Sequence, residues 1–387
     1  MTHRHMMILT SILLAGLGLI LFVPARSLAS CTWSTFSTPN VTLDNVLDGI
    51  AAVSAKDAIA VGDSEPSGGN PSALILAYGG TPPTWKVVSF KEPGVQSVFV
   101  SVSPFSSNGA WLAGSYNPTS SSGPLPLAGK LLGSTFTNLG APAPPTAVST
   151  QLRAVLTLTP TTAMFVGRYD TISGLTQNYA LKWTGTSFVN LNAPNSPTVS
   201  SDFRDVKGVP GTSNVVVSGF HRDADGDSVP FVYVYHTSTN TWSTPRALDP
   251  SINGAYFLGL AAASSTEIWA AGRLQNGSKD LPMIQKFNES TSTFTLQSLP
   301  SFSPSVRLAS VAARSSTNVL AVGWTETGTM PVALEWNGTT WSNQSPSISG
   351  PVFESVAAVP GTTSYFAAGY DRVGLAVNTV VAAGSCT

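Results

Sequence analysis

A short apolar run that ends in glycine recurs seven times along this chain of 387 residues. The steps between successive glycines are 52, 53, 52, 53, 51 and 46 residues, so the copies keep one register. Self-similarity at a period near 50 residues is the signature of a repeat architecture, and it constrains the fold more than any local motif does. The copies are Ile59–Gly62, Trp111–Gly114, Met164–Gly167, Val216–Gly219, Trp269–Gly272, Leu320–Gly323 and Phe366–Gly369.

Each copy carries the pattern of four short strands. A segment rich in Ala and Val, such as Leu308–Ala312, precedes the glycine, and an alternating segment such as Val332–Trp336 follows it after a polar loop. A tight turn comes next, as at Asn337–Thr339, where Asn-Gly favours positive φ at both central positions. Four strands per period make one propeller blade, so we predict an all-β, seven-bladed β-propeller with four antiparallel strands per blade. The fourth strands carry aromatic residues that should fill the wedge between blades: Trp85, Phe136, Phe188, Trp242, Phe294 and Trp341.

The seventh copy lacks this aromatic. The matching offset from Gly369 falls on Thr387, whereas Cys31-Thr32-Trp33-Ser34 resembles Thr339-Thr340-Trp341-Ser342 of the sixth copy. We therefore expect a 3+1 closure, in which the N-terminal strand completes the last blade and removes the open sheet edges.

Cys31 and Cys386 are the two cysteines, and two hypotheses compete for Cys31. Aligning the blades places the two residues where a short turn joins the third and fourth strands elsewhere, which favours a disulfide of the kind found in exported proteins. Leu28-Ala29-Ser30-Cys31 also fits a bacterial lipobox, in which Cys31 becomes a lipidated N-terminus.

The repeat resembles the kelch repeat of galactose-oxidase-type propellers. The fourth copy carries the resemblance best, in Val216–Gly219, Val232–Tyr235, Thr239–Trp242 and Pro245. Kelch repeats end the second strand in a pair of glycines, and here one glycine stands alone. The resemblance covers nearly all of residues 31–387, and what it implies is the fold rather than a function.

The first 30 residues have the features of a cleaved signal peptide. A short basic start precedes an apolar run at Ile8–Val23, and Ser27-Leu28-Ala29 offers small residues for cleavage. We expect residues 31–387 to form a single propeller domain that is secreted or held at the cell surface, with no membrane span and as a monomer. The formal net charge of the whole sequence is -1, without a basic patch, which argues against nucleic acid as a partner.

Familiar catalytic motifs are missing from residues 31–387. The two histidines there are His221 and His236, and neither a nucleophile elbow nor a zinc-protease, Walker or dinucleotide motif is present. Two carboxylates from different blades can still converge on one site. The acids expected on the long loops are Asp63, Glu65, Asp170, Asp223, Asp280, Glu326 and Asp371.

Two groups of residues are candidates for ligand binding. Arginines lie one to three residues beyond the repeat glycine in four blades, where they could bind a carboxylate or a sugar acid: Arg168, Arg222, Arg273 and Arg372. We group Asp63, Asp170 and Asp371 with them, while solvated strand-end charges are the simpler interpretation. Asp223, Asp225 and Asp227 alternate on a loop with Gly226 and make Ca²⁺ the candidate metal, although the EF-hand spacing is absent.

The pattern favours an extracytoplasmic, non-catalytic binding or scaffold module for a glycan or protein ligand. The alternative is a secreted hydrolase or lyase that acts on polysaccharide. Acids that converge with Tyr or Arg in the central funnel would favour the enzyme, and a funnel of Ala, Ser and Thr would favour the binding module.

Overall fold

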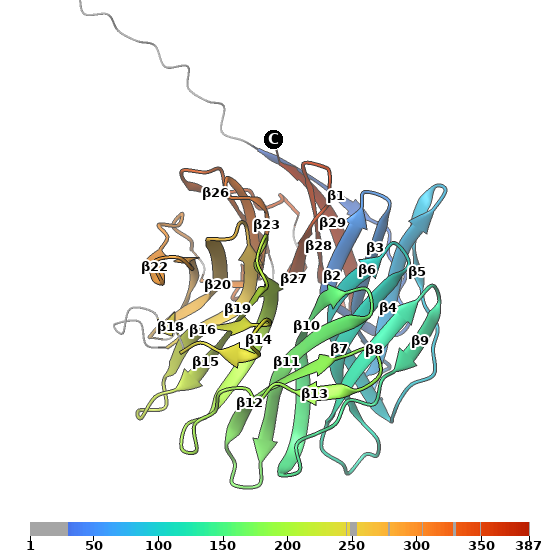
Figure 1. Ribbon diagram of the computed structural model, residues 1–387. Coiled ribbons are helices and arrows are strands. Elements are labelled where there is room, and N and C mark those ends of the chain that lie inside the picture. Colours follow the sequence, from blue (N-terminus) through green and yellow to red (C-terminus); the bar gives the residue numbers. More distant parts are fainter. Residues whose placement is uncertain are drawn as a thin grey trace, which may run out of the picture.

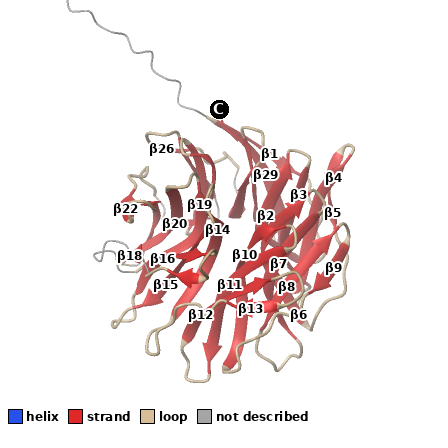
Figure 2. Cartoon of the chain, in the orientation of Figure 1, coloured by secondary structure: helices blue, strands red, loops and turns tan. Residues whose placement is uncertain are grey.

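The computed structural model describes residues 30–244, 246–247, 254–277, 279–303, 305–327, 330–348 and 350–386. Within these ranges the regular secondary structure consists of strands alone, and the strands form seven blades around a central axis (Figures 1 and 2). The predicted signal segment lies almost wholly outside the described residues.

The first three blades account for the strands from β2 to β13. Their bounds are β2 (Asp44–Ser54), β3 (Asp57–Glu65), β4 (Ser72–Gly80) and β5 (Pro83–Val87); β6 (Gln96–Ser106), β7 (Gly109–Asn117), β8 (Leu125–Leu132) and β9 (Thr135–Asn138); β10 (Ala147–Thr159), β11 (Thr162–Thr171), β12 (Thr176–Trp183) and β13 (Phe188–Asn190).

The next three blades follow the same order. They contain β14 (Ser201–Gly208), β15 (Asn214–Arg222), β16 (Ser228–His236) and β17 (Thr241–Trp242), with the short β18 (Arg246–Ala247); β19 (Ala255–Ala262), β20 (Glu267–Asn276), β21 (Lys279–Asn288) and β22 (Thr293–Leu296); β23 (Val306–Ser315), β24 (Asn318–Thr325), β25 (Pro331–Trp336) and β26 (Trp341–Asn343).

The seventh blade confirms the predicted 3+1 closure. Strands β27 (Pro351–Ala358), β28 (Ser364–Val373) and β29 (Ala376–Cys386) are completed by β1 (Cys31–Phe36), which pairs antiparallel with β29 (Figure 1). Cys31 lies opposite Cys386 in this register, and the two form a disulfide. Trp33 supplies the missing aromatic and stacks on Phe353 with ring centroids 5.5 Å apart. One parallel pair, Asp44 with Val377, joins this blade to the first in a single sheet.

The repeat glycine has a steric cause that is the same in all seven blades. Each glycine lies opposite the innermost strand directly before a β-bulge, as Gly62 does opposite Leu47. A Cβ there would lie 1.8–2.1 Å from a carbonyl oxygen of that strand, so no other residue fits without a shift of the backbone. The bulge inserts one extra residue into the innermost strand. We call these the bulge residues: Asp48, Val100, Arg153, Arg204, Leu258, Ala309 and Glu354.

Packing between blades supplies the core. Seven clusters of buried apolar side chains are found in the described chain, and each draws on two neighbouring blades. The outer-strand aromatics fill the wedge as predicted, since Phe136 packs against Phe99 and Trp242 stacks on Phe203 of their own blades. These clusters therefore join every blade to its two neighbours around the channel.

The turn at Asn337 differs from the expectation of positive φ at both positions. Only Gly338 of that pair has positive φ, at 97°. The Asn337 side chain instead accepts hydrogen bonds from the amides of Thr339 and Thr340, at 3.0 and 2.9 Å. This side-chain cap stabilises a longer turn than the two-residue hairpin that Asn-Gly usually forms.

Candidate functional site

The axial channel contains a cavity of about 380 Å³ lined by the innermost strands of all seven blades. Six of the seven bulge residues in the described chain line it, and Arg204 turns aside to a neighbouring carboxylate. Elsewhere in the channel much of the lining is small and neutral, with Ala52, Ser103 and Ala313 among its residues, and Asp205 and Lys207 add one charged pair. The channel thus combines both linings that the sequence left open: charged groups at the bulges, which we call the channel neck, and Ala and Ser elsewhere.

Two acids of the channel neck come from the adjacent blades 1 and 7. Burial, followed by the negative charges of Glu354 and Asp63, raises the pKa of Asp48 well above its ordinary value, and the positive charge of Arg153 offsets only part of this rise. Burial alone raises the pKa of Glu354 to about 7. Asp63, a sequence candidate on β3, belongs to the same group, and burial followed by Glu65 raises its pKa to about 6. These carboxyls hold protons more tightly than carboxyls in water do.

Arg153 lines the channel from blade 3, and its pKa is also shifted. Burial lowers its pKa to about 10, and the charge of Asp202 works in the opposite direction. Asp202 is buried, lies 2.7 Å from the guanidinium of Arg204 and 3.7 Å from that of Arg168. A buried carboxylate therefore pairs with two arginines, and the charges of all three act on Arg153.

Asp170 was a sequence candidate on β11, close to Arg168 and Arg153. Burial works to raise its pKa, but hydrogen bonds donated by Ser149 and Thr176 and the two nearby arginines lower it overall. Both carboxylate oxygens of Asp170 therefore already accept hydrogen bonds from hydroxyl groups, and its part in ligand binding stays a prediction.

A second group, the arginine–tyrosine cluster, lies over blades 4 and 5 and consists of Phe220, Arg222, Tyr256 and Arg273. The rings of Phe220 and Tyr256 pack edge to face with centroids 4.7 Å apart. The guanidinium of Arg273 lies 4.7 Å from the Tyr256 ring centroid, and that of Arg222 lies 5.9 Å from it. Arg204 of blade 4 connects the cluster to Asp202, because its guanidinium lies 5.2 Å from the Phe220 ring centroid and 2.7 Å from the Asp202 carboxylate.

The phenol of Tyr256 is electrostatically tuned by these neighbours. Burial works to raise its pKa, but the nearby Ser228 hydroxyl and the positive charges of Arg222 and Arg273 outweigh it and hold the pKa below its ordinary value. A cation favours the phenolate form of a tyrosine just as it favours a carboxylate. Tyr256 is thus easier to deprotonate than a tyrosine in water.

Buried Asp280, another sequence candidate, orients the outer side of the cluster. Its carboxylate accepts a hydrogen bond from Arg273 at 2.5 Å and a second from Arg307 of blade 6. Arg307 also lies 3.8 Å from Glu326. Charge-assisted hydrogen bonds of this kind fix the direction in which a guanidinium presents its remaining donors.

The other sequence candidates lie outside these groups. Arg372 stacks on Tyr370 of its own blade, 5.6 Å from the ring centroid, and Asp371 lies against the backbone of Gly350. Asp223 accepts hydrogen bonds from the amides of Asp225 and Asp227 at 3.0 and 2.8 Å, so one of its oxygens already closes the exposed loop. The calcium site at these three residues stays a prediction.

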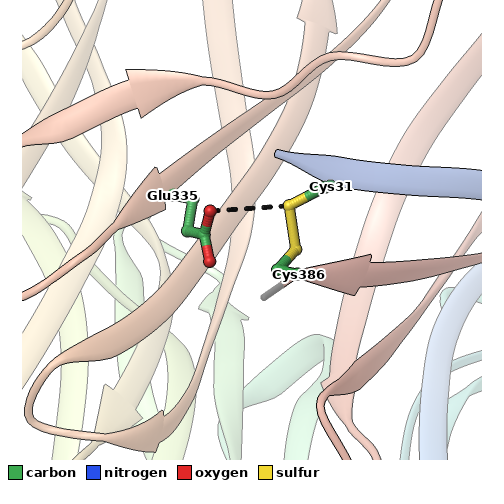
Figure 3. Close-up of side chains that lie close together, drawn as sticks. All are labelled: Cys31, Glu335 and Cys386. Carbon is green, nitrogen blue, oxygen red and sulfur yellow. Dashed lines mark hydrogen bonds between the residues drawn. A yellow bond between two sulfur atoms is a disulfide. The ribbon is translucent and has the colours of Figure 1, made fainter. Parts of the chain in front are cut away.

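The disulfide lies beside a buried carboxyl group. The Sγ of Cys31 is 3.6 Å from a carboxylate oxygen of Glu335, the contact drawn in Figure 3. Glu335 also accepts a hydrogen bond from Asn318 at 3.1 Å, and burial raises its pKa despite Asn318 and Arg314. Cysteines joined in a disulfide offer no thiolate to a metal, and Cys31 in this bond is not the lipidated N-terminus of the lipobox hypothesis.

Sequence reasoning missed Asp48, Arg153, Arg204, Tyr256 and Glu354. A signal for the bulge residues was present, since each lies 14 residues before its repeat glycine in five blades and 15 in two. Aligned as a column, that position is charged in blades 1, 3, 4 and 7. The alternation of polar and apolar residues along a strand did not reveal this position, because a bulge adds one residue and so interrupts the two-residue period.

No protein-family model matches the chain, and no curated protein matches it either. Among solved structures, one described as a new family of polysaccharide lyase, an ulvan lyase bound to -[GlcA(1-4)Rha3S]-, superposes with a TM-score of 0.54 at 10% identity. That match covers 87% of this chain and 94% of the other. A second structure of an ulvan lyase gives 0.54 and 10%, over 91% and 94% of the two chains.

The likeness shows the fold alone. It agrees with the seven-bladed architecture, whereas the kelch resemblance has no matching family model behind it. In the described part of the chain, no helix is long and apolar enough to cross a membrane.

Proposed function

We propose that this propeller binds an acidic polysaccharide on the arginine–tyrosine cluster. The observation that carries the proposal is Tyr256 held between Arg222 and Arg273, with Phe220 beside it. Guanidinium groups bind the carboxylates of sugar acids through paired hydrogen bonds, and aromatic rings contact the apolar faces of sugar rings. A chain of uronic acids presents both features in alternation.

The arginines of this cluster are held in place before any ligand arrives. Arg273 is fixed by Asp280, and Arg222 donates a hydrogen bond to the carbonyl of Gly226 at 3.0 Å. A pre-oriented guanidinium loses less side-chain entropy on binding than a free one. Its donors that are not used within the protein remain for a carboxylate.

Binding is tested with polygalacturonate, a linear polyuronate, and with dextran as the neutral polysaccharide. We expect Arg222→Gln and Arg273→Gln each to weaken polygalacturonate binding by about tenfold, the value of one charge-assisted contact. Arg372→Gln, which removes an arginine of another blade, is the matched control and should bind as the wild type does. Equal binding of both polysaccharides, or equal loss in all three variants, would show that the cluster does not recognise the acid.

Tyr256 favours a second candidate function, cleavage of the bound polysaccharide by elimination. The phenolate removes the proton on C5 of a uronate, the electron pair forms a C4–C5 double bond, and the C4–oxygen bond to the next sugar breaks. In a galacturonate the C5 hydrogen and the C4 oxygen lie on opposite faces of the ring, so the leaving oxygen takes up its proton from water on the face away from Tyr256. An arginine that neutralises the uronate carboxylate makes the C5 proton more acidic, so one tyrosine suffices as the base.

The two candidates differ in the product and in the effect of one hydroxyl. If elimination occurs, the unsaturated product absorbs ultraviolet light, and Tyr256→Phe should lower its formation by about 10²–10⁴-fold while binding persists. If Tyr256→Phe and the wild type both bind polygalacturonate and neither releases unsaturated product, then elimination is excluded for this polyuronate and binding alone remains.

A further inference from the structure

The channel neck carries ionisable groups of both kinds, two acids and one arginine, that find no partner within the described chain. The carboxylates of Asp48 and Glu354 and the guanidinium of Arg153 all line the same cavity. None of the three side chains makes a hydrogen bond or an ion pair with any described residue, and the Nε of Arg153 is fully buried without an acceptor. Buried charges without partners are costly, so their presence calls for an explanation.

Neighbouring charges in the same channel behave differently. Asp205 and Lys207 also line the cavity, and they pair with each other at 2.7 and 2.9 Å. Arg204, at the equivalent bulge position of blade 4, turns to Asp202 instead of into the cavity. The chain therefore pairs charges where it can, and leaves Asp48, Glu354 and Arg153 open to the cavity.

The two unpaired acids and the unpaired arginine lie in different parts of the ring. Asp48 and Glu354 come from the adjacent blades 1 and 7, whereas Arg153 comes from blade 3, close enough to act on Asp48 but beyond ion-pairing distance. The two acids also repel each other, which a nearby positive group would relieve. A cavity of about 380 Å³ lies between them, at the small end of the range for ligand pockets.

We propose that the channel neck binds a small organic zwitterion, with its ammonium group between Asp48 and Glu354 and its carboxylate at Arg153. Each end of such a ligand supplies the charge that its side of the neck lacks. A simple anion would face two carboxylates, and a simple cation would face an arginine, so only a ligand with separated charges satisfies the whole site. The site involves none of the residues of the arginine–tyrosine cluster and stands independently of the proposed function.

The test measures calorimetric binding of 6-aminohexanoate to the full chain, with hexylamine, hexanoate and Ca²⁺ as single-charge probes. We expect 6-aminohexanoate to bind at least about tenfold more tightly than any of the others. Glu354→Gln and Arg153→Gln should each weaken its binding by about tenfold or more. Arg372→Gln, which leaves the channel intact, is the control, and the melting temperature of each variant shows whether it has folded.

Two outcomes would overturn the proposal. If hexylamine or Ca²⁺ binds as well as 6-aminohexanoate and Arg153→Gln changes nothing, the neck is a plain cation site. If nothing binds at about 10 mM in a folded protein, the charges are merely hydrated by channel water. Should Arg153→Gln fail to fold, Arg153→Lys keeps the charge without the planar fork, and it must still discriminate between hexylamine and 6-aminohexanoate.

Discussion

At the scale of single residues, the bulge position separates structure from chemistry. The residue before it is apolar and buried in every blade, from Leu47 to Phe353, because it packs between blades. The bulge residue itself varies from Ala309 to Arg153 and Glu354, because the channel imposes no such demand. One register position is therefore free to differ from blade to blade on a fixed scaffold.

Glu354 gives a pH-dependent prediction at this scale. Its pKa is raised to about 7 by burial, so the folded protein binds this proton more tightly than the unfolded chain does. The stability of the folded state that depends on this proton is fully present at acid pH. It is lost as the pH rises above the pKa of Glu354 in the unfolded chain and on through about 7. We expect Glu354→Gln to raise the free energy of unfolding above pH 7 by on the order of 1–3 kcal/mol.

Urea unfolding at acid and alkaline pH checks this prediction. The difference between Glu354→Gln and the wild type should grow with pH and nearly vanish at acid pH, where both side chains are neutral. A difference that is the same at both pH values would mean that Glu354 is not desolvated in the channel neck.

At the scale of the strand, the repeat glycine is what makes each bulge possible. The Cβ of an alanine at Gly323 would lie 1.8 Å from the carbonyl oxygen of Arg307. We expect Gly323→Ala to lower the free energy of unfolding by about 2–4 kcal/mol, because the backbone of the blade must shift. Gly79, on strand β4, is the matched control: its nearest neighbour would be 3.7 Å away, so Gly79→Ala should be neutral or slightly stabilising. Equal losses in both variants would contradict the steric explanation.

The same element scale shows what the sequence can and cannot predict. The blades, the closure by β1 and the stacking aromatics follow from the spacing of glycines and aromatics, because those residues recur in every copy. The channel neck does not follow from this spacing. Asp48, Arg153 and Glu354 each occur in one copy only, and closure of the ring brings them to one cavity. Tyr256 was missed for a similar reason, since its partners Arg222 and Ser228 belong to another blade.

At the scale of the whole molecule, one covalent bond closes the ring. The disulfide joins residues separated by 355 positions, so in the chain-entropy model it stabilises the fold by about 6 kcal/mol. We expect the double variant Cys31→Ser/Cys386→Ser to lose about this much in urea unfolding. Intact mass before and after reduction should show the loss of the bond in the wild type. An unchanged unfolding midpoint in the double variant would mean that β1 holds the blade closed without it.

Because β1 lies beside β29, the seam of the ring is a matter of connectivity rather than of architecture. The Cα atoms of Cys31 and Cys386 are 4.1 Å apart, close to the spacing of two bonded residues, so a short peptide linker could replace the sulfur bridge there. A circular permutant linked at this point and opened at an outer turn such as Asn337–Thr340 would carry the same blades in a different chain order. The position of the new termini would then decide which blade receives its fourth strand from the opposite end of the chain. That blade would be the first to open when the two termini are pulled apart.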